Sequence, residues 1–391
     1  MKKLSCMKLA GLAIAGLLAS GSAMAAGADC ALWGGNLVKW PAANPIWEMC
    51  WVRPSQSVAA DGSGLELRDI HYKGILVAKR LHAPILFAEY RNSSTCYRDW
   101  KDADATFAAT PPVRNMLGIP GSFLATTTCD VSQAATTSYG SCPWPGLPGS
   151  PFTSGDCMSG GGVSIEDMGD HVVLTSQYSA AWYQYTGRYV FWANGDIQPE
   201  FGFGNRDGTN NNLTHWHHNY WRFDLDIDGA GNNAILANGV PQSTEFTGLR
   251  SQTGGPGGGP TYWDVITTKG GYGYRIVSGS NDYNPPNQSG RGFHTIDVIG
   301  SRFVNNEYAD QANNNLGDCT MASGNIANNQ SIADTDVVFY YRTSVRDVNG
   351  TDWPPGCSGA TCEPQNSMVC KQGGPTMTQI GDWPIFRDGF E

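Results

Sequence analysis

The sequence is poor in charge and lacks any basic cluster. Charged residues make up 15% of the 391-residue chain, against about 25% in an average soluble domain. The formal net charge is −10 and the lysines and arginines are scattered, which argues against a phosphate-binding surface and so against nucleic acid as a partner. No segment carries a sustained helical repeat of apolar residues, which argues against a helical bundle or a coiled coil.

Long apolar runs are also missing. No stretch reaches the roughly 18 consecutive apolar residues that a transmembrane helix needs, so we expect no membrane span. A shorter apolar run, Leu9–Leu18, follows Lys2 and Lys3 and precedes a small-residue cleavage site at Ala23–Ala25. The sequence therefore predicts a signal peptide over residues 1–25, cleaved near Ala25, and export to the periplasm or the outside of the cell.

The cysteines agree with export. Of the 11 cysteines, Cys6 lies in the expected signal peptide, and the even number that remains favours disulfides in an oxidising compartment. A Cys-x-x-Cys pair is absent, which disfavours a zinc–thiolate site. Pairing of Cys129 with Cys157 and of Cys357 with Cys370 is plausible, but the sequence leaves the connectivity open.

Strand signals dominate what is present. Gly (49 residues) and Pro (22 residues) are abundant and mark many turns. Between them lie short segments rich in β-branched and aromatic residues, several with a two-residue alternation. These predicted strands are Leu65–Val77, Pro84–Tyr90, His171–Thr175, Tyr183–Phe191, Trp221–Ile227, Tyr272–Val277 and Asp336–Thr343. We expect one all-β domain, most simply a large β-sandwich.

One segment concentrates histidine. Three of the seven histidines fall at His215, His217 and His218. In a strand, residues two apart share a face, so His215 and His217 would present two imidazoles side by side while His218 faces the other way. Such a pair suits copper or zinc. The alternative is an exposed polar strand end with no ligand.

Two more segments are informative by their order along the chain. Tyr183–Trp192 is an aromatic strand followed by Asn194-Gly195, which predicts a hairpin. Core packing alone would account for its tyrosines. The segment Asp336–Asp347 predicts a buried strand that runs out into an acidic loop.

Taken together, the three segments resemble the catalytic domain of copper amine oxidases. That family has a His-x-His followed by an Arg-Leu-Asp-Met type of strand, which places its two histidines on His215 and His217, counted back from Arg222. Its quinone-precursor motif, Asn-Tyr-(Asp/Glu)-Tyr before an aromatic strand, matches Tyr183 as the precursor and Tyr185 as the second tyrosine. Further segments that look like the family are Gly64–Tyr72, Leu86–Glu89 and Ile165–Gly169.

The resemblance implies the fold and the domain limits. It implies an all-β chain dominated by a large β-super-sandwich of the copper amine oxidase catalytic-domain type. We expect an N-terminal extension over residues 26–63, the catalytic-like domain over residues 64–356, and a disulfide-bearing tail over residues 357–391.

The resemblance also implies a chemistry. Family members hold copper and topaquinone, a quinone formed from a tyrosine of the chain, here Tyr183, with Tyr185 as a further cofactor-binding position. They convert a primary amine, O2 and water to an aldehyde, ammonia and hydrogen peroxide, and they are usually homodimers. The proton-accepting aspartate of the family lies upstream of the quinone, where this chain offers Asp99, Asp102 and Asp104. Surface carboxylates in a polar loop are the alternative for all three.

A second metal position is implied as well. Family members bind a peripheral cation, often calcium, which would here be held by Asp224 and the carbonyl of Leu225 together with Asp336 and the carbonyl of Val337. Carboxylate and carbonyl oxygens are the ligands that calcium prefers. Without the resemblance, Asp224 and Asp226 would be interpreted as a solvated strand end.

The sequence departs from the family at the chemistry. Asp347 stands where the family has its third copper-ligating histidine, and Trp182 and Gln184 replace the residues that flank the precursor tyrosine. Two imidazoles and one carboxylate can still hold copper or zinc. Three hypotheses follow: a divergent copper/topaquinone amine oxidase, a non-catalytic binding or structural module, and a quinone-free metal site.

Overall fold

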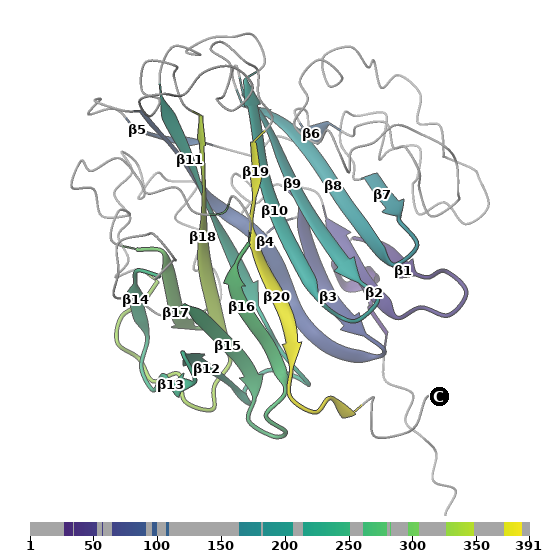
Figure 1. The fold of residues 1–391 in the computed structure, drawn as a ribbon. Coiled ribbons are helices and arrows are strands. Elements are labelled where there is room, and N and C mark those ends of the chain that lie inside the picture. Colours follow the sequence, from purple (N-terminus) through teal and green to yellow (C-terminus); the bar gives the residue numbers. More distant parts are fainter. Residues whose placement is uncertain are drawn as a thin grey trace, which may run out of the picture.

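The fold is a sandwich of two antiparallel β-sheets (Figure 1). The structure is a computed structural model that describes residues 27–33, 35–52, 57, 65–90, 96–99, 107–108, 164–180, 183–205, 214–250, 261–279, 282, 296–304, 326–347 and 371–384. Within these ranges the only helix is a single 3-10 turn, Cys30–Trp33. No helix among the described residues is long and apolar enough to cross a membrane. The predicted all-β super-sandwich is confirmed.

The first sheet has nine strands and carries the histidine cluster. Its order is β1-β2-β3-β4-β11-β18-β17-β14, with β5 paired to the second half of β4. The strands are β1 (Asn36–Trp40), β2 (Trp47–Val52), β3 (Glu66–Tyr72), β4 (Ile75–Tyr90), β5 (Cys96–Asp99), β11 (His215–Asp224), β14 (Phe246–Gly248), β17 (Val298–Arg302) and β18 (Val337–Asp347).

The second sheet has eleven strands and carries the expected quinone strand. Its order is β13-β12-β15-β16-β20-β10-β9-β8-β6, with β19 paired to β10 and β7 to β8. The strands are β6 (Phe107–Ala108), β7 (Ser164–Asp167), β8 (His171–Ala180), β9 (Tyr183–Trp192), β10 (Ile197–Asn205), β12 (Asn233–Ala237), β13 (Val240–Pro241), β15 (Tyr262–Thr267), β16 (Gly273–Ser278), β19 (Lys371–Gly373) and β20 (Pro375–Ile380).

Aromatic side chains fill the space between the sheets. Trp47 of the first sheet packs against Phe191 of the second at 4.9 Å between ring centroids, and its indole nitrogen donates to the carbonyl of Trp192 at 2.8 Å. Both the burial of large rings and the satisfied indole favour this face-to-face packing. The inner faces of the two sheets therefore form one continuous core.

The turn between β3 and β4 divides one of the expected strands. The expected strand Leu65–Val77 is wrong as a single strand, because Lys73 and Gly74 adopt φ values of 47° and 81° and reverse the chain between β3 and β4. Two consecutive left-handed residues form the tight turn that suits a two-residue hairpin. The segment Pro84–Tyr90 is likewise the second half of the 16-residue strand β4 rather than a separate strand.

The Asn-Gly hairpin is confirmed. Gly195 has φ 96° and donates its backbone N–H to the carbonyl of Trp192 at 2.9 Å, between β9 and β10. The other predicted strands fall on β8, β11, β16 and β18. The histidine strand β11, however, begins at His215, six residues before the expected start at Trp221, and it ends at Asp224.

One disulfide lies in the described residues. Cys30 and Cys50 are bonded across a sequence separation of 20 residues and fix the 3-10 turn to β2. The pairs Cys129–Cys157 and Cys357–Cys370 lie outside the described residues. The domain limits expected from the sequence stay predictions.

Candidate metal centre on the inner face of the first sheet

His215 and His217 lie side by side in the core. Both side chains are fully buried, which overturns the alternative of an exposed strand end. Their ring centroids are 5.2 Å apart with the ring planes at 76°. Burial, followed by the nearby His215 and His218, lowers the pKa of His217 well below its usual value. His217 is therefore a neutral imidazole at physiological pH, which is the form that binds metal.

Each histidine of the pair has a tyrosine beside it. The hydroxyl of Tyr185 lies 2.9 Å from Nδ1 of His217, and the ring centroids are 5.3 Å apart. Tyr90 stacks on His215 with centroids 5.4 Å apart and ring planes at 24°. Tyr185 comes from the second sheet and Tyr90 from the neighbouring strand β4, so the pair is held from two directions.

His218 faces the opposite side of the sheet, as the alternation predicts. Its Nδ1 lies 2.7 Å from Oγ of Ser344 on β18, and its Nε2 lies 3.1 Å from Oε2 of Glu89 on β4. All three side chains are fully buried. Since β11 lies between β4 and β18, His218 ties the strand that carries the histidine pair to both of its neighbours.

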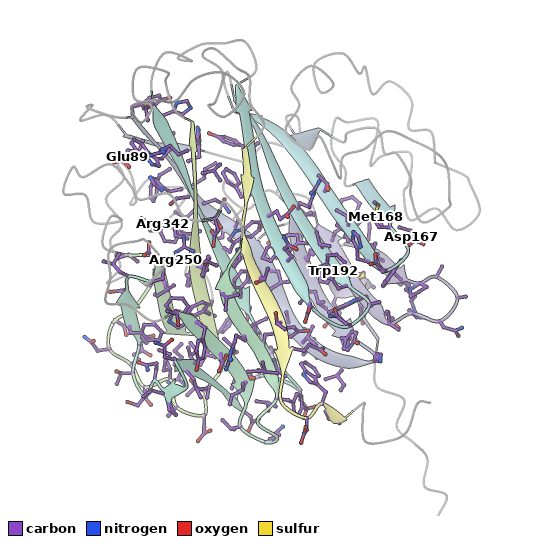
Figure 2. The ribbon with its side chains drawn as sticks, viewed as in Figure 1. Glu89, Asp167, Met168, Trp192, Arg250 and Arg342 are labelled. Carbon is purple, nitrogen blue, oxygen red and sulfur yellow. A yellow bond between two sulfur atoms is a disulfide. The ribbon has the colours of Figure 1, made fainter. Side chains whose placement is uncertain are left out.

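Two buried ion pairs lie beside β18. Arg342 bonds Asp297, and Arg250 bonds Asp282 at 2.8 Å, with all four side chains buried. Figure 2 shows Glu89, Arg342 and Arg250 one below another along the same side of the molecule. Arg342 is in β18, and Asp282 accepts a hydrogen bond from the hydroxyl of Tyr341 in the same strand at 2.6 Å.

The backbone of Asp347 lies directly across from His215. In the ladder of β11 and β18, His215 pairs with Asp347 and His217 with Val345. Direct partners in an antiparallel ladder share a face, so position 347 is on the same face as the histidine pair. Position 347 is thus the position of β18 directly beside His215.

Position 183 lies at the level of His215. Tyr185 meets His217, and four residues further along both strands Tyr189 meets Trp221 with ring centroids 5.4 Å apart. The two strands therefore run alongside each other in step, although they belong to different sheets. Two residues before Tyr185, position 183 falls on the same face of β9 and opposite His215.

Of the aspartates expected as a base, Asp99 lies in a strand. Asp99 pairs with Leu86, which in turn pairs with Asn219 of β11. Asn219 is two residues from His217, so position 99 shares the inner face with the histidine pair. Since β4 lies between β5 and β11, the backbones of β5 and β11 are about 10 Å apart. Asp102 and Asp104 lie outside the described residues.

An acidic cluster lies at the far end of β11. Carboxylate oxygens of Asp224, Asp226 and Asp336 all lie within 4.8 Å of one another. Asp224 and Asp226 are buried, so the interpretation as a solvated strand end is wrong. Burial, together with the charges of Asp224 and Asp336, raises the pKa of Asp226 to about 8. Leu225 and Val337, whose carbonyls the sequence assigns to this site, are buried beside it.

Sequence reasoning missed three features of this region. It did not find the contact of Tyr185 with His217, the clamp of His218 with Glu89 and Ser344, or Asp226 as the third carboxylate. The only sequence signal for these features is the two-residue alternation of a strand. It puts Tyr185 on the same face as position 183, and Asp226 on the same face as Asp224. The pairing of β11 with β4 and β18, which the sequence does not reveal, supplied the rest.

Fold and site together define a large β-sandwich protein with a buried histidine pair between its sheets. No family model and no curated protein sequence matches the chain. Among solved structures, the copper-containing benzylamine oxidase from Hansenula polymorpha matches with a TM-score of 0.54 over 88% of this chain and 60% of that chain, at 14% identity.

A second similar structure is the lysyl oxidase of Pichia pastoris. It has a TM-score of 0.50 over 88% of this chain and 51% of that chain, at 11% identity. The chain therefore has the fold of the copper amine oxidases and spans roughly half to three fifths of the length of these enzymes. At such identities the likeness defines the fold.

Proposed function

We propose that the protein is an exported, copper-dependent primary-amine oxidase whose organic cofactor is made from Tyr183. The reaction converts a primary amine, O2 and water to an aldehyde, ammonia and hydrogen peroxide. The observation that carries the proposal is the buried pair His215 and His217, which lies on the inner face of the sandwich opposite the strand that contains Tyr183. Both side chains are fully buried, and burial lowers the pKa of His217 well below its usual value, which favours the neutral imidazole that a metal binds.

The donor set suits copper. His215 and His217 supply imidazole nitrogens, and Asp347 stands across the ladder from His215. Imidazole suits copper and zinc, and a carboxylate completes a three-ligand set with a harder oxygen donor. The carboxylate in place of a third imidazole lowers the preference for Cu(I) over Cu(II).

The register of Tyr183 and Asp99 is compatible with the roles that the resemblance implies for them. When present, the quinone would accept the two electrons of the amine, and O2 would be the terminal oxidant with copper beside it. Within the chain, Tyr183 would provide the carbon skeleton of the quinone at the level of His215. Asp99, on the same inner face as the histidine pair, would take the proton from the α-carbon of the amine. Asp102 stays the alternative base.

We also propose that Asp224, Asp226 and Asp336 hold a hard cation such as Ca2+, with the carbonyls of Leu225 and Val337. Three carboxylates close together repel one another, and a divalent cation removes that repulsion. The raised pKa of Asp226 agrees with this, because burial and the charges of Asp224 and Asp336 disfavour a further negative charge there, which a cation would offset. Export and a homodimer complete the proposal. Detection of the cleaved protein outside the cytoplasm tests export, and light scattering of the purified protein tests the dimer.

A quinone-free metal site is the second candidate. The set of two histidines and one carboxylate favours it, since that set needs no modified tyrosine to bind a metal. The non-catalytic module would bind no metal at His215 and His217.

One experiment separates the three functions. The purified mature protein is incubated with Cu2+ in air and then with phenylhydrazine, and the peptide that contains Tyr183 is examined by mass spectrometry. We expect a hydrazine adduct on Tyr183, absent from Tyr183→Phe and from the double variant His215→Ala/His217→Ala. The variant Tyr189→Phe, on the same strand and away from the histidines, should keep the adduct.

The other outcomes assign the remaining functions. Bound copper with an unmodified Tyr183 contradicts the oxidase and favours the quinone-free site. If the protein shows no adduct and binds no copper, the non-catalytic module is the remaining function.

A further inference from the structure

Tyr185 makes a contact that the resemblance does not assign. Its hydroxyl lies 2.9 Å from Nδ1 of His217, a normal hydrogen-bond distance, and both side chains are fully buried. The two residues are 32 positions apart in the chain and lie in different sheets. The contact therefore fixes a side chain of the first sheet from the second.

The chemistry of imidazole gives this contact a consequence. The ring has two nitrogens, and the one that carries the proton is set by the hydrogen bond that the other makes. A ligating histidine usually donates its second N–H to an oxygen, which fixes the tautomer and the direction of the ring. With Nδ1 of His217 held by the phenol oxygen, Nε2 is the nitrogen that reaches a metal.

The phenol is itself held in place. Tyr185 lies in the middle of the second sheet, between Tyr178 of β8 and Phe203 of β10 in register. Its ring packs against Phe201 with centroids 5.7 Å apart. Since a buried aromatic ring in a continuous sheet has few alternative rotamers, the hydroxyl stays aimed at His217.

We propose that Tyr185 is a positioning residue that sets the tautomer of His217, so that the proton stays on Nδ1 and the metal binds Nε2. The proposal rests on the metal site of the proposed function and deepens it. It separates the two tyrosines of the motif: Tyr183 is the precursor of the cofactor and Tyr185 orients a ligand.

The chain offers a matched control. Tyr189 lies on the same face of the same strand, four residues from Tyr185, and is equally buried. It packs against Trp221 at 5.4 Å rather than against a histidine. Tyr189→Phe therefore removes one buried hydroxyl from β9, as Tyr185→Phe does, at a distance from the proposed ligands.

The experiment measures metal binding and tautomer state, not turnover. Zn2+ affinity is measured by competition with a chromophoric chelator for the wild type, Tyr185→Phe and Tyr189→Phe. Loss of an outer hydrogen-bond partner weakens metal binding by about 10- to 100-fold. We expect that loss for Tyr185→Phe and a change below about 3-fold for Tyr189→Phe, since Tyr189 packs against Trp221, four residues along β11 from His217.

Nitrogen NMR of 15N-histidine-labelled protein gives the second readout. The metal-free wild type should show a single tautomer of His217, and Tyr185→Phe should show a mixture. Thermal unfolding of both variants shows whether the fold survives.

The outcomes distinguish this inference from the proposed function. If the wild type binds Zn2+ and the variants Tyr185→Phe and Tyr189→Phe bind it with equal affinity, the role of Tyr185 is overturned but the metal site is not. An unchanged tautomer in Tyr185→Phe overturns it as well. If the wild type binds neither Zn2+ nor Cu2+, or if His215→Ala/His217→Ala binds as tightly, both the metal site and the inference fail.

Discussion

Asp347 stands directly across the ladder from His215, at the last residue of β18 and the first residue of β11. The start of β11 and the end of β18 thus lie at the same end of the sheet. The two residues are neighbours through strand pairing, although they are far apart in the sequence. The backbone register therefore places position 347 beside position 215.

A first prediction concerns that donor. Asp347→Ala should lower the affinity for Cu2+ by about 10-fold or more, because it removes one of three expected ligands. Asp347→His should raise it above the wild type, because a third imidazole replaces a harder oxygen. Competition titration with a copper chelator measures both. Equal affinities for all three proteins would show that Asp347 does not ligate.

A second prediction concerns the clamp on the outer face. His218→Ala removes hydrogen bonds to Glu89 and Ser344 in a fully buried setting and should lower the free energy of unfolding by about 3 kcal/mol. His171→Ala is the control, since His171 bonds the exposed Asp170 at 2.6 Å and its loss should cost less than about 1 kcal/mol. Chemical denaturation of the two variants compares them. A similar small loss in both would mean that His218 does not tie the strands.

A third prediction concerns acid stability. Burial alone would raise the pKa of Asp69, but the nearby imidazole of His71 and hydrogen bonds from the backbone N–H of Asp29 and from Lys79 lower it well below the usual value. Because the folded pKa lies below the unfolded one, the stabilisation is complete above about pH 4 and is lost as the pH falls below that value.

The substitution Asp69→Asn isolates that charge. Asparagine tolerates the left-handed backbone at this position, where φ is 52°. The wild type should be the more stable protein at pH 6, and the difference should shrink as the pH falls below about 4. Denaturation at several pH values measures it, and a difference that is constant with pH would contradict the prediction.

A fourth prediction concerns the disulfide. Cys30 and Cys50 close a loop of 20 residues, for which the loss of chain entropy in the unfolded state corresponds to about 3 kcal/mol. The double variant Cys30→Ala/Cys50→Ala should lose that amount in chemical denaturation. Metal affinity at the histidine pair should stay unchanged, because β1 and β2 lie on the far side of β3 and β4 from β11.

Much of the fold was predictable and the reasons are local. Alternating apolar residues and the Asn194-Gly195 turn predicted β9 and its hairpin, because both signals lie within a few residues of each other. The Lys73-Gly74 turn was missed because lysine is an unusual residue at a left-handed position. The start of β11 was missed because the histidines there are polar, although the structure buries them.

The site was predictable only in part. Strand alternation placed His215 and His217 on one face and His218 on the other, and the structure agrees. The neighbours of these residues depend on which strands pair, and no short segment encodes that β11 lies between β4 and β18. Tyr185, Glu89 and Ser344 could therefore not be assigned from their positions in the chain.

Because β9 and β11 run alongside each other, the histidine centre depends on whether the number of residues inserted into or deleted from β9 is odd or even. Deleting or inserting one residue between 183 and 189 would reverse the faces of the segment and turn Trp182 or Gln184 toward the histidines in place of Tyr183. A change of two residues would preserve the faces but shift every contact by one step along the strand. Length variation among relatives should thus be confined to the connections between strands, and the β9 segment should change by substitution alone.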